Sequence, residues 1–217
     1  SARWEKIAYG NGKFVVVSSN NSNVVLYSTN GINWIQTTMP ISANWYSVAY
    51  GNGMFAAIAG GSNNAAYSDD GINWTQTTMP VSSNWADVAY GNGKFVAVSR
   101  NGTIAYSSNG INWTNSSSSF STQWSSVAYG NGLFVVASAT SASNIGAYSQ
   151  DGINWTQCSI PLGPSTGAYG ITFGSDMFVV VGGYHPSFAA YSVSFKPSDA
   201  ALLALYNRIT ALENAIA

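Results

Sequence analysis

The chain has 217 residues, of which 7% are charged, and its formal net charge is −1. Globular proteins carry about 25% charged residues. Seven scattered cations cannot neutralise the phosphates of a nucleic acid, and an anionic membrane surface is disfavoured for the same reason. A surface built from Asn, Ser, Thr, Gly and Tyr suits uncharged partners instead, sugars above all.

The chain has one cysteine, Cys158, so an internal disulfide is impossible. We expect Cys158 to be an ordinary thiol near a turn rather than a nucleophile. No apolar run approaches the ~20 residues of a membrane span, and the sequence gives no sign of a signal peptide. A processed chain would lack one as well, so export stays open.

The sequence repeats itself at intervals of about 40 residues. Four copies begin at Trp4, Trp45, Trp85 and Trp124, and a diverged fifth copy begins at Ala168. In each of the four, a segment such as VAYGNGKFVAVS predicts strand, tight turn and strand, and YSxxGINW predicts a second hairpin. Four short strands per repeat are typical of propeller blades. The predicted fold class is therefore all-β, a five-bladed β-propeller of four-stranded antiparallel blades over residues 1–196.

The segment SDDGINW, residues 68–74, resembles the Asp-box of sialidase-like propellers, a hairpin between the third and fourth strands. It has one residue fewer between Asp and Gly, and two copies carry Asn30 and Asn109 in place of Asp. The combined repeat, over residues 4–196, also resembles repeats of phage tail and bacterial surface proteins. The resemblance implies that these hairpins are structural and lie away from the ligand face.

The other connections are the candidate binding loops. Because successive strands alternate in direction, the two tight turns of each blade must share one face, and the longer, variable connections must share the opposite face. Function concentrates in variable loops on a rigid frame. The predicted ligand-binding residues are loop side chains that can hydrogen-bond or stack on a sugar: Asn20, Asn21, Asn63, Asn64, Arg100, Asn101, Tyr184 and His185. We predict no catalytic residue, no metal ligand and no cofactor.

The charged residues argue against a sialidase. That chemistry uses three arginines and a Tyr–Glu pair, whereas the only glutamates here are Glu5 and Glu213, at the two ends. Among the aspartates of the repeats, Asp87 alone maps to the variable face, and a usual glycosidase needs two facing carboxylates. No His/Cys cluster suggests zinc. We therefore predict that the chain is not an enzyme.

The last twenty residues change pattern. Ser198 is a plausible N-cap, and a heptad seam follows at Leu202, Leu205, Ile209, Leu212 and Ile216. The pattern predicts an oligomerisation helix over residues 198–217. RITALE resembles a motif of trimeric coiled coils, although the Ile and Leu positions alone favour dimers. We expect a homotrimer, the alternative being a helix docked on its own propeller.

A propeller on a trimeric stalk, with low charge and polar-aromatic loops, resembles a phage tail-fibre or surface adhesin. The expected function is non-enzymatic binding of a cell-surface carbohydrate, at a virion tail or cell surface, with avidity supplied by several copies. Two alternatives stay open. One is a structural spacer in a virion or injection machine, and the other is a sialidase-like glycoside hydrolase.

Overall fold

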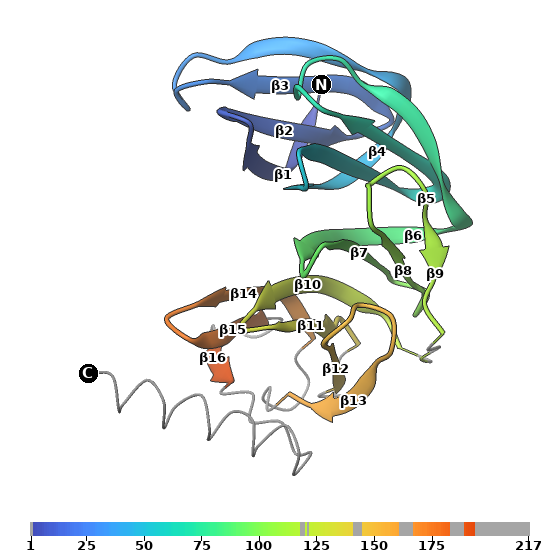
Figure 1. Ribbon diagram of the computed structural model, residues 1–217, viewed down its shortest axis with the longest axis vertical. Helices are drawn as coiled ribbons and strands as arrows, with labels where there is room; N and C mark the ends of the chain where they lie inside the picture. Colours follow the sequence, from blue (N-terminus) through green and yellow to red (C-terminus); the bar gives the residue numbers. More distant parts are fainter. Residues whose placement is uncertain are drawn as a thin grey trace.

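The computed structural model describes residues 2–117, 120, 122–140, 145–160, 167–182 and 189–193. In this part of the chain, sixteen strands form five antiparallel sheets, one for each sequence repeat. We call these sheets blades 1 to 5. Figure 1 shows the blades following one another along an arc, with blade 1 at one end and blade 5 at the other.

Blades 1 to 3 form one continuous ribbon of hydrogen-bonded strands. Its members are β1 (Arg3–Gly10), β2 (Lys13–Ser19), β3 (Ser22–Ser28), β4 (Ile35–Gly51), β5 (Met54–Ser68), β6 (Thr75–Gly91), β7 (Lys94–Ser99), β8 (Ile104–Ser107) and β9 (Thr114–Asn115). Both β4 and β6 change partners along their length, so each ends one blade and begins the next. Two of the connections expected to be variable loops are therefore strand.

Blades 4 and 5 repeat the arrangement. Blade 4 contains β10 (Trp124–Gly130), β11 (Leu133–Ser138), β12 (Ile145–Ser149) and β13 (Thr156–Ser159). Blade 5 has three described strands, β14 (Ala168–Gly174), β15 (Met177–Gly182) and β16 (Ala189–Val193).

The predicted fold class, a five-bladed propeller with a C-terminal helix, needs correction. The described residues contain no helix, hence none that could cross a membrane, and the predicted helix 198–217 lies outside them. The five blades also leave the ring open, because Tyr9 in blade 1 is 60% exposed and a Cβ on Gly174 in blade 5 would meet no atom within 4 Å. The fold is all-β and consistent with a β-propeller, but these five blades do not define its blade number.

The GNG turns form as their sequence predicts. Asn is held in the left-handed region, with φ between 44° and 49°, at Asn11, Asn52, Asn92 and Asn131. The glycine that follows each Asn also has positive φ. Two successive residues with positive φ produce a tight hairpin whose twist matches that of its strands. These turns fix the register between the first two strands of blades 1 to 4.

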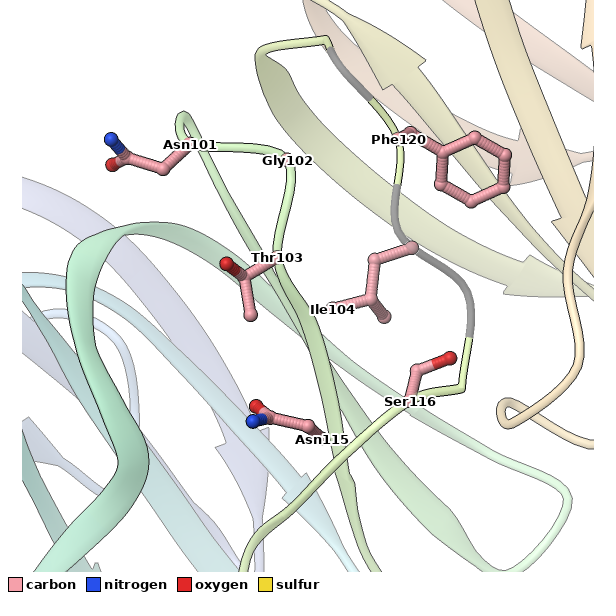
Figure 2. A pocket seen from close by; sticks show the side chains of 7 residues that line it. All are labelled: Asn101, Gly102, Thr103, Ile104, Asn115, Ser116 and Phe120. Carbon is pink, nitrogen blue, oxygen red and sulfur yellow. The ribbon is translucent and has the colours of Figure 1, made fainter.

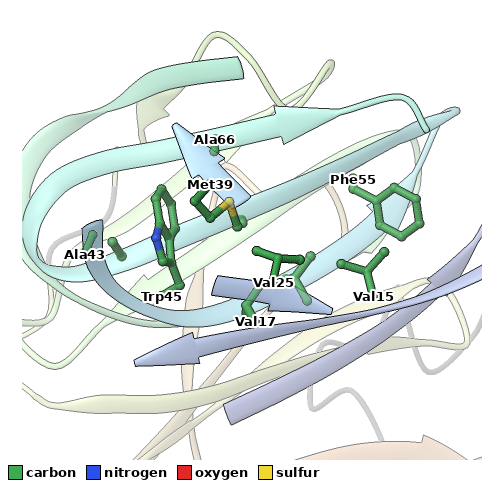
Figure 3. Packing of buried hydrophobic residues seen from close by; sticks show 11 residues of the cluster. Val15, Val17, Val25, Met39, Ala43, Trp45, Phe55 and Ala66 are labelled. Carbon is green, nitrogen blue, oxygen red and sulfur yellow. The ribbon is translucent and has the colours of Figure 1, made fainter. Parts of the chain in front are cut away.

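The apolar core lies between the facing sheets of neighbouring blades. Between blades 1 and 2, Val15, Val17 and Val25 meet Trp45 and Phe55, and all five side chains are fully buried (Figure 3). Similar clusters lie between the later blades. Since burial of apolar surface is the main stabilising term in folding, each blade depends on its neighbours for stability.

In blades 2 to 5, one aromatic ring from the first strand of the blade, which we call its inner strand, covers a glycine of the preceding blade. A Cβ added to any of these glycines would lie 1.9–2.0 Å from the ring's Cγ, so only glycine fits. The four pairs are Gly10 with Tyr50, Gly51 with Tyr90, Gly91 with Tyr129, and Gly130 with Phe173. This repeated contact sets the close approach between successive blades.

The aromatic–glycine contact predicts that replacement of glycine by alanine lowers stability at Gly51 but not at Gly174. Gly51→Ala should destabilise the fold by about 1–3 kcal/mol, the usual cost of overpacking, because its Cβ would overlap Tyr90. Gly174→Ala should leave stability nearly unchanged, since its Cβ meets open space. Urea denaturation of the two variants checks this, and equal midpoints would show that the blades can shift apart freely.

Candidate functional site

The face that carries the tight turns, which we call the turn face, is held by its own side chains. In blade 2, the Ser68 hydroxyl donates to Asp70 Oδ1 over 2.9 Å and accepts from Gly71 N over 2.8 Å. Asp70 Oδ1 also accepts from the backbone N–H groups of Ile72 and Asn73, each over 2.8 Å. Equivalent bonds form around the pairs Ser28–Asn30, Ser107–Asn109 and Ser149–Asp151. These polar side chains are engaged in shaping the hairpins.

The two turn aspartates are stabilised in their ionised form. Burial raises the pKa of Asp70, but hydrogen bonds from Asn73, Ile72 and Ser68 outweigh it and lower the pKa to about 2. The pKa of Asp151 is also lowered to about 2, with burial again opposed by hydrogen bonds from its own turn. A carboxylate that accepts several N–H bonds holds its charge to low pH.

Further bonds connect the turn face from blade to blade. Asn11 Nδ2 of blade 1 donates to the Asp69 carbonyl of blade 2 over 3.0 Å, and Asn92 Nδ2 of blade 3 donates to the Gln150 carbonyl of blade 4 over 2.9 Å. The Thr77 hydroxyl likewise donates to the Ile111 carbonyl of the next blade over 2.7 Å. This face therefore serves as scaffold.

The lowered pKa values predict a loss of stability in acid. Stability that depends on an ionised Asp70 and Asp151 is present above the unfolded-state pKa of about 3.8 and is lost as the pH falls toward 2. In the double variant Asp70→Asn, Asp151→Asn this loss should be smaller, because Asn30 and Asn109 already make the same turns. Thermal melts from pH 5 to pH 2 measure the difference, and parallel curves would contradict it.

Blades 1 to 4 meet at the carboxylate of Asp87, which is 3% exposed, and blade 5 connects to it through Ser126. Asp87 Oδ1 accepts from Lys6 Nζ of blade 1 over 2.9 Å and from the Ser47 hydroxyl of blade 2 over 2.8 Å. Its Oδ2 accepts from the Ser126 hydroxyl of blade 4 over 2.7 Å, and the N–H of Ile171 in blade 5 donates to Ser126 Oγ over 3.3 Å. The buried charge is thus paired and hydrogen-bonded, as a buried carboxylate must be.

A β-bulge near the start of each inner strand positions these groups. In each blade the register shifts between the first residue of the repeat and the residue two positions later. In blades 1 to 4 that later residue is polar: the shifts lie between Trp4 and Lys6, Trp45 and Ser47, Trp85 and Asp87, and Trp124 and Ser126, and in blade 5 between Ala168 and Gly170. Bulges re-aim a side chain relative to the regular alternation. The sequence contained this signal, because these four polar residues stand at the same place in four copies.

Removal of the Asp87 carboxylate should be costly. Asp87→Ala leaves the buried hydroxyls of Ser47 and Ser126 without their acceptor, and we expect a loss of about 3 kcal/mol or more. Asp69→Ala, which removes an exposed carboxylate from the turn face, is the matched control and should cost less than about 0.5 kcal/mol. Denaturant titration tests both variants. Equal stability of the two variants would show that the Asp87 contacts contribute little.

The face opposite the turns, which we call the loop face, carries the described members of the predicted ligand set. Asn20 and Asn21 join β2 to β3 with positive φ, and Asn63 and Asn64 lie inside β5 rather than in a loop. Tyr184 and His185 lie outside the described residues. The described residues fall in pairs, one pair in each of blades 1 to 3, so the structure does not gather them into one site.

Arg100 and Asn101, the pair in blade 3, both contact neighbouring strands. The exposed Arg100 guanidinium lies 5.9 Å from the centre of the Tyr46 ring of blade 2. The side-chain oxygen of Asn101 accepts from the Asn84 backbone N–H over 3.0 Å, which ties the β7–β8 connection to β6. Asn101 is therefore partly structural. The sequence did not single out Tyr46.

A pocket of about 210 Å³ opens beside this pair (Figure 2). It lies between β8 and the segment that leads to blade 4, and it is lined by Asn101, Gly102, Thr103, Ile104, Asn115, Ser116 and Phe120. In Figure 2 the Ile104 side chain extends toward the segment that carries Ser116 and Phe120. Phe120 also makes an edge-on contact with Trp124, with ring centres 5.4 Å apart. The lining of the pocket thus combines apolar side chains with amide and hydroxyl groups.

The repeats differ in sequence between two of the lining residues, Ser116 and Phe120. Counted from the second tryptophan, the third repeat has Ser118 where the others have Met39, Met79 and Ile160. Those three side chains are at most 2% exposed and fill the core beside their blades. A serine cannot fill the volume of a methionine or isoleucine. Ser118 itself lies outside the described residues.

Neither metal chemistry nor thiol chemistry has support in the described part of the chain. It contains no group of three His, Cys, Asp or Glu side chains that could hold a metal ion. Burial raises the pKa of the Cys158 thiol to about 12, so the reactive thiolate is disfavoured. The expectation of an ordinary thiol agrees with this environment.

No family model and no curated protein matches the chain. Among solved structures, it is similar to a catalytically inactive virginiamycin B lyase from Staphylococcus aureus with quinupristin (TM-score 0.71, 14% identity, covering 91% of this chain and 71% of that one). It is also similar to a streptogramin B lyase (0.65, 11%, 89% and 84%) and to a nidogen/laminin complex (0.64, 8%, 88% and 76%). These similarities support a β-propeller fold. The Asp-box resemblance rests on the four turns alone.

The prediction that the chain is not an enzyme is wrong, because neither the fold nor the composition of the chain excludes catalysis. Two of the solved structures that share the fold are lyases, while the nidogen/laminin structure is a complex between proteins. A propeller supports catalysis and binding alike, because function belongs to the site rather than the fold. The lack of a second facing carboxylate bears on one hydrolytic mechanism only.

Proposed function

We propose that the protein binds uncharged carbohydrate through the loop face, with the pocket between β8 and Phe120 as the primary site. The observation that carries the proposal is a pocket on this face whose lining combines apolar side chains with amide and hydroxyl groups. A sequence difference supports it, because the third repeat has Ser118 where two others have a buried methionine. The turn face, by contrast, has its polar side chains engaged in hairpins and interblade bonds.

The chemistry of the pocket matches a sugar ring. A pyranose presents C–H groups on its face and hydroxyls around its edge. The partly buried Phe120 ring can pack against the face, and the exposed Asn115 amide can both donate to and accept from hydroxyls. The volume of about 210 Å³ is below the ~300–1,000 Å³ of drug-sized ligand pockets, so it suits one ring of a longer glycan.

Single-ring sites are weak, so several copies would strengthen attachment. As part of the proposal, the protein acts at a virion tail or cell surface, and residues 198–217 assemble it as a homotrimer. The low charge of the chain supports this choice of ligand, because neutral glycans need no ion pair.

The test is a glycan array with the intact protein, followed by titration of the strongest ligand. Ser118→Met restores the residue type that is buried in two other repeats, and should lower affinity at least tenfold, which corresponds to 1.4 kcal/mol. Phe120→Leu keeps an apolar side chain but removes the ring, and should also weaken binding.

Gln76→Ala is a control for substitution outside the pocket, because Gln76 holds in blade 2 the position that the lining residue Asn115 holds in blade 3. It should leave affinity unchanged. If the folded protein binds no glycan on the array, the carbohydrate proposal fails and the structural spacer is favoured. If a glycan binds and Ser118→Met has no effect, the ligand is carbohydrate but the site is misplaced. Hydrolysis or elimination of a bound glycan would identify an enzyme.

A further inference from the structure

The two ends of the blade arc expose side chains that are buried in every blade between them. In blade 1, Trp4 is 45% exposed, whereas Trp45, Trp85 and Trp124 at the same place in blades 2 to 4 are 0% exposed. Ile7 is 52% exposed, although its counterparts Val48, Val88 and Val127 are at most 4% exposed. Blade 1 therefore presents to solvent the surface that each later blade places against its predecessor.

Blade 5 presents the opposite surface. Val181 is 47% exposed, while its counterparts in blades 1 to 3, Val17, Ile58 and Val98, are 0% exposed. Gly174 stands where Gly10, Gly51, Gly91 and Gly130 stand in the other blades, and a Cβ added there would meet nothing within 4 Å. Blade 5 thus has the glycine of the interblade contact without a ring to cover it.

The two exposed ends are complementary. Tyr9 of blade 1 occupies the position of Tyr50, Tyr90, Tyr129 and Phe173, each of which covers a glycine of the preceding blade. Tyr9 is 60% exposed and Gly174 is uncovered. The kind of surface that covers this glycine in the other blades therefore exists on blade 1, at the far end of the arc from blade 5 (Figure 1).

We propose that a second copy of this chain docks head to tail, with blade 1 of one copy against blade 5 of the other. Tyr9 of one copy then covers Gly174 of its neighbour, and Trp4, Ile7 and Val181 become buried. The contact continues an interface that already occurs four times within the chain, and a net charge of −1 offers little repulsion. Contacts between unlike surfaces close into a ring or extend as a helical array, depending on their rotation.

The test uses the full chain and two substitutions, each of which removes one end of the contact. Tyr9→Ser removes the ring, and Gly174→Val places a side chain where the ring must lie. Both positions are open in the single copy, so both variants should fold. By native mass spectrometry and light scattering, the unmodified protein should form larger species than either variant alone as its concentration rises, because each variant can assemble only through other parts of the chain, such as residues 198–217. Ile32→Ser, which removes an exposed apolar side chain from the turn face, should behave like the unmodified protein.

Mixing the two variants gives the decisive result. The Tyr9→Ser copy keeps an intact blade 5 end and the Gly174→Val copy keeps an intact blade 1 end, so the mixture should form a species with twice the mass of either variant alone. Absence of that species would overturn the proposal. So would a mass distribution of Tyr9→Ser identical to that of the unmodified protein at every concentration, because Tyr9 would then take no part in assembly.

Discussion

The ionic and hydrogen-bonded contacts of Asp87 are the constraint on which the arrangement of the blades depends. A buried carboxylate is tolerated only where cations and donors surround it. Here those partners come from the inner strands of other blades, including Lys6, which lies two blades away. Each strand must carry its bulge at the same place for the groups to converge. The bulges and the charge thus fix a common centre.

The remaining interactions divide the molecule into two structurally different faces. On the turn face, nearly identical sequences make nearly identical hairpins, and their side chains are engaged within and between blades. On the loop face, sequence differences between repeats are expressed as differences in shape. β5 continues through the connection in blade 2, whereas Arg100 and Asn101 form a turn in blade 3. A uniform frame therefore tolerates local change on one side only.

The fold was largely predictable from the sequence because the same local turn signals recur in each repeat. The GNG steps and the Ser–Asp or Ser–Asn pairs are local signals, and the structure places each of them in a tight turn. The open arc was not predictable, since Tyr9 and Gly174 are the same residue types that are buried elsewhere. The role of Asp87 required knowledge of which strands converge. Enzymatic activity could not be decided from the fold, because lyases share it.

The packing of Met39 and Met79 has a consequence for how such a repeat could diversify. Both side chains are 2% exposed, and neither takes part in the hairpin hydrogen bonds or in the contacts of Asp87. Exchange of either methionine for a smaller residue would therefore change the packing beside one blade while those polar contacts stay in place. The repeats can thus diverge one position at a time while the architecture stays constant.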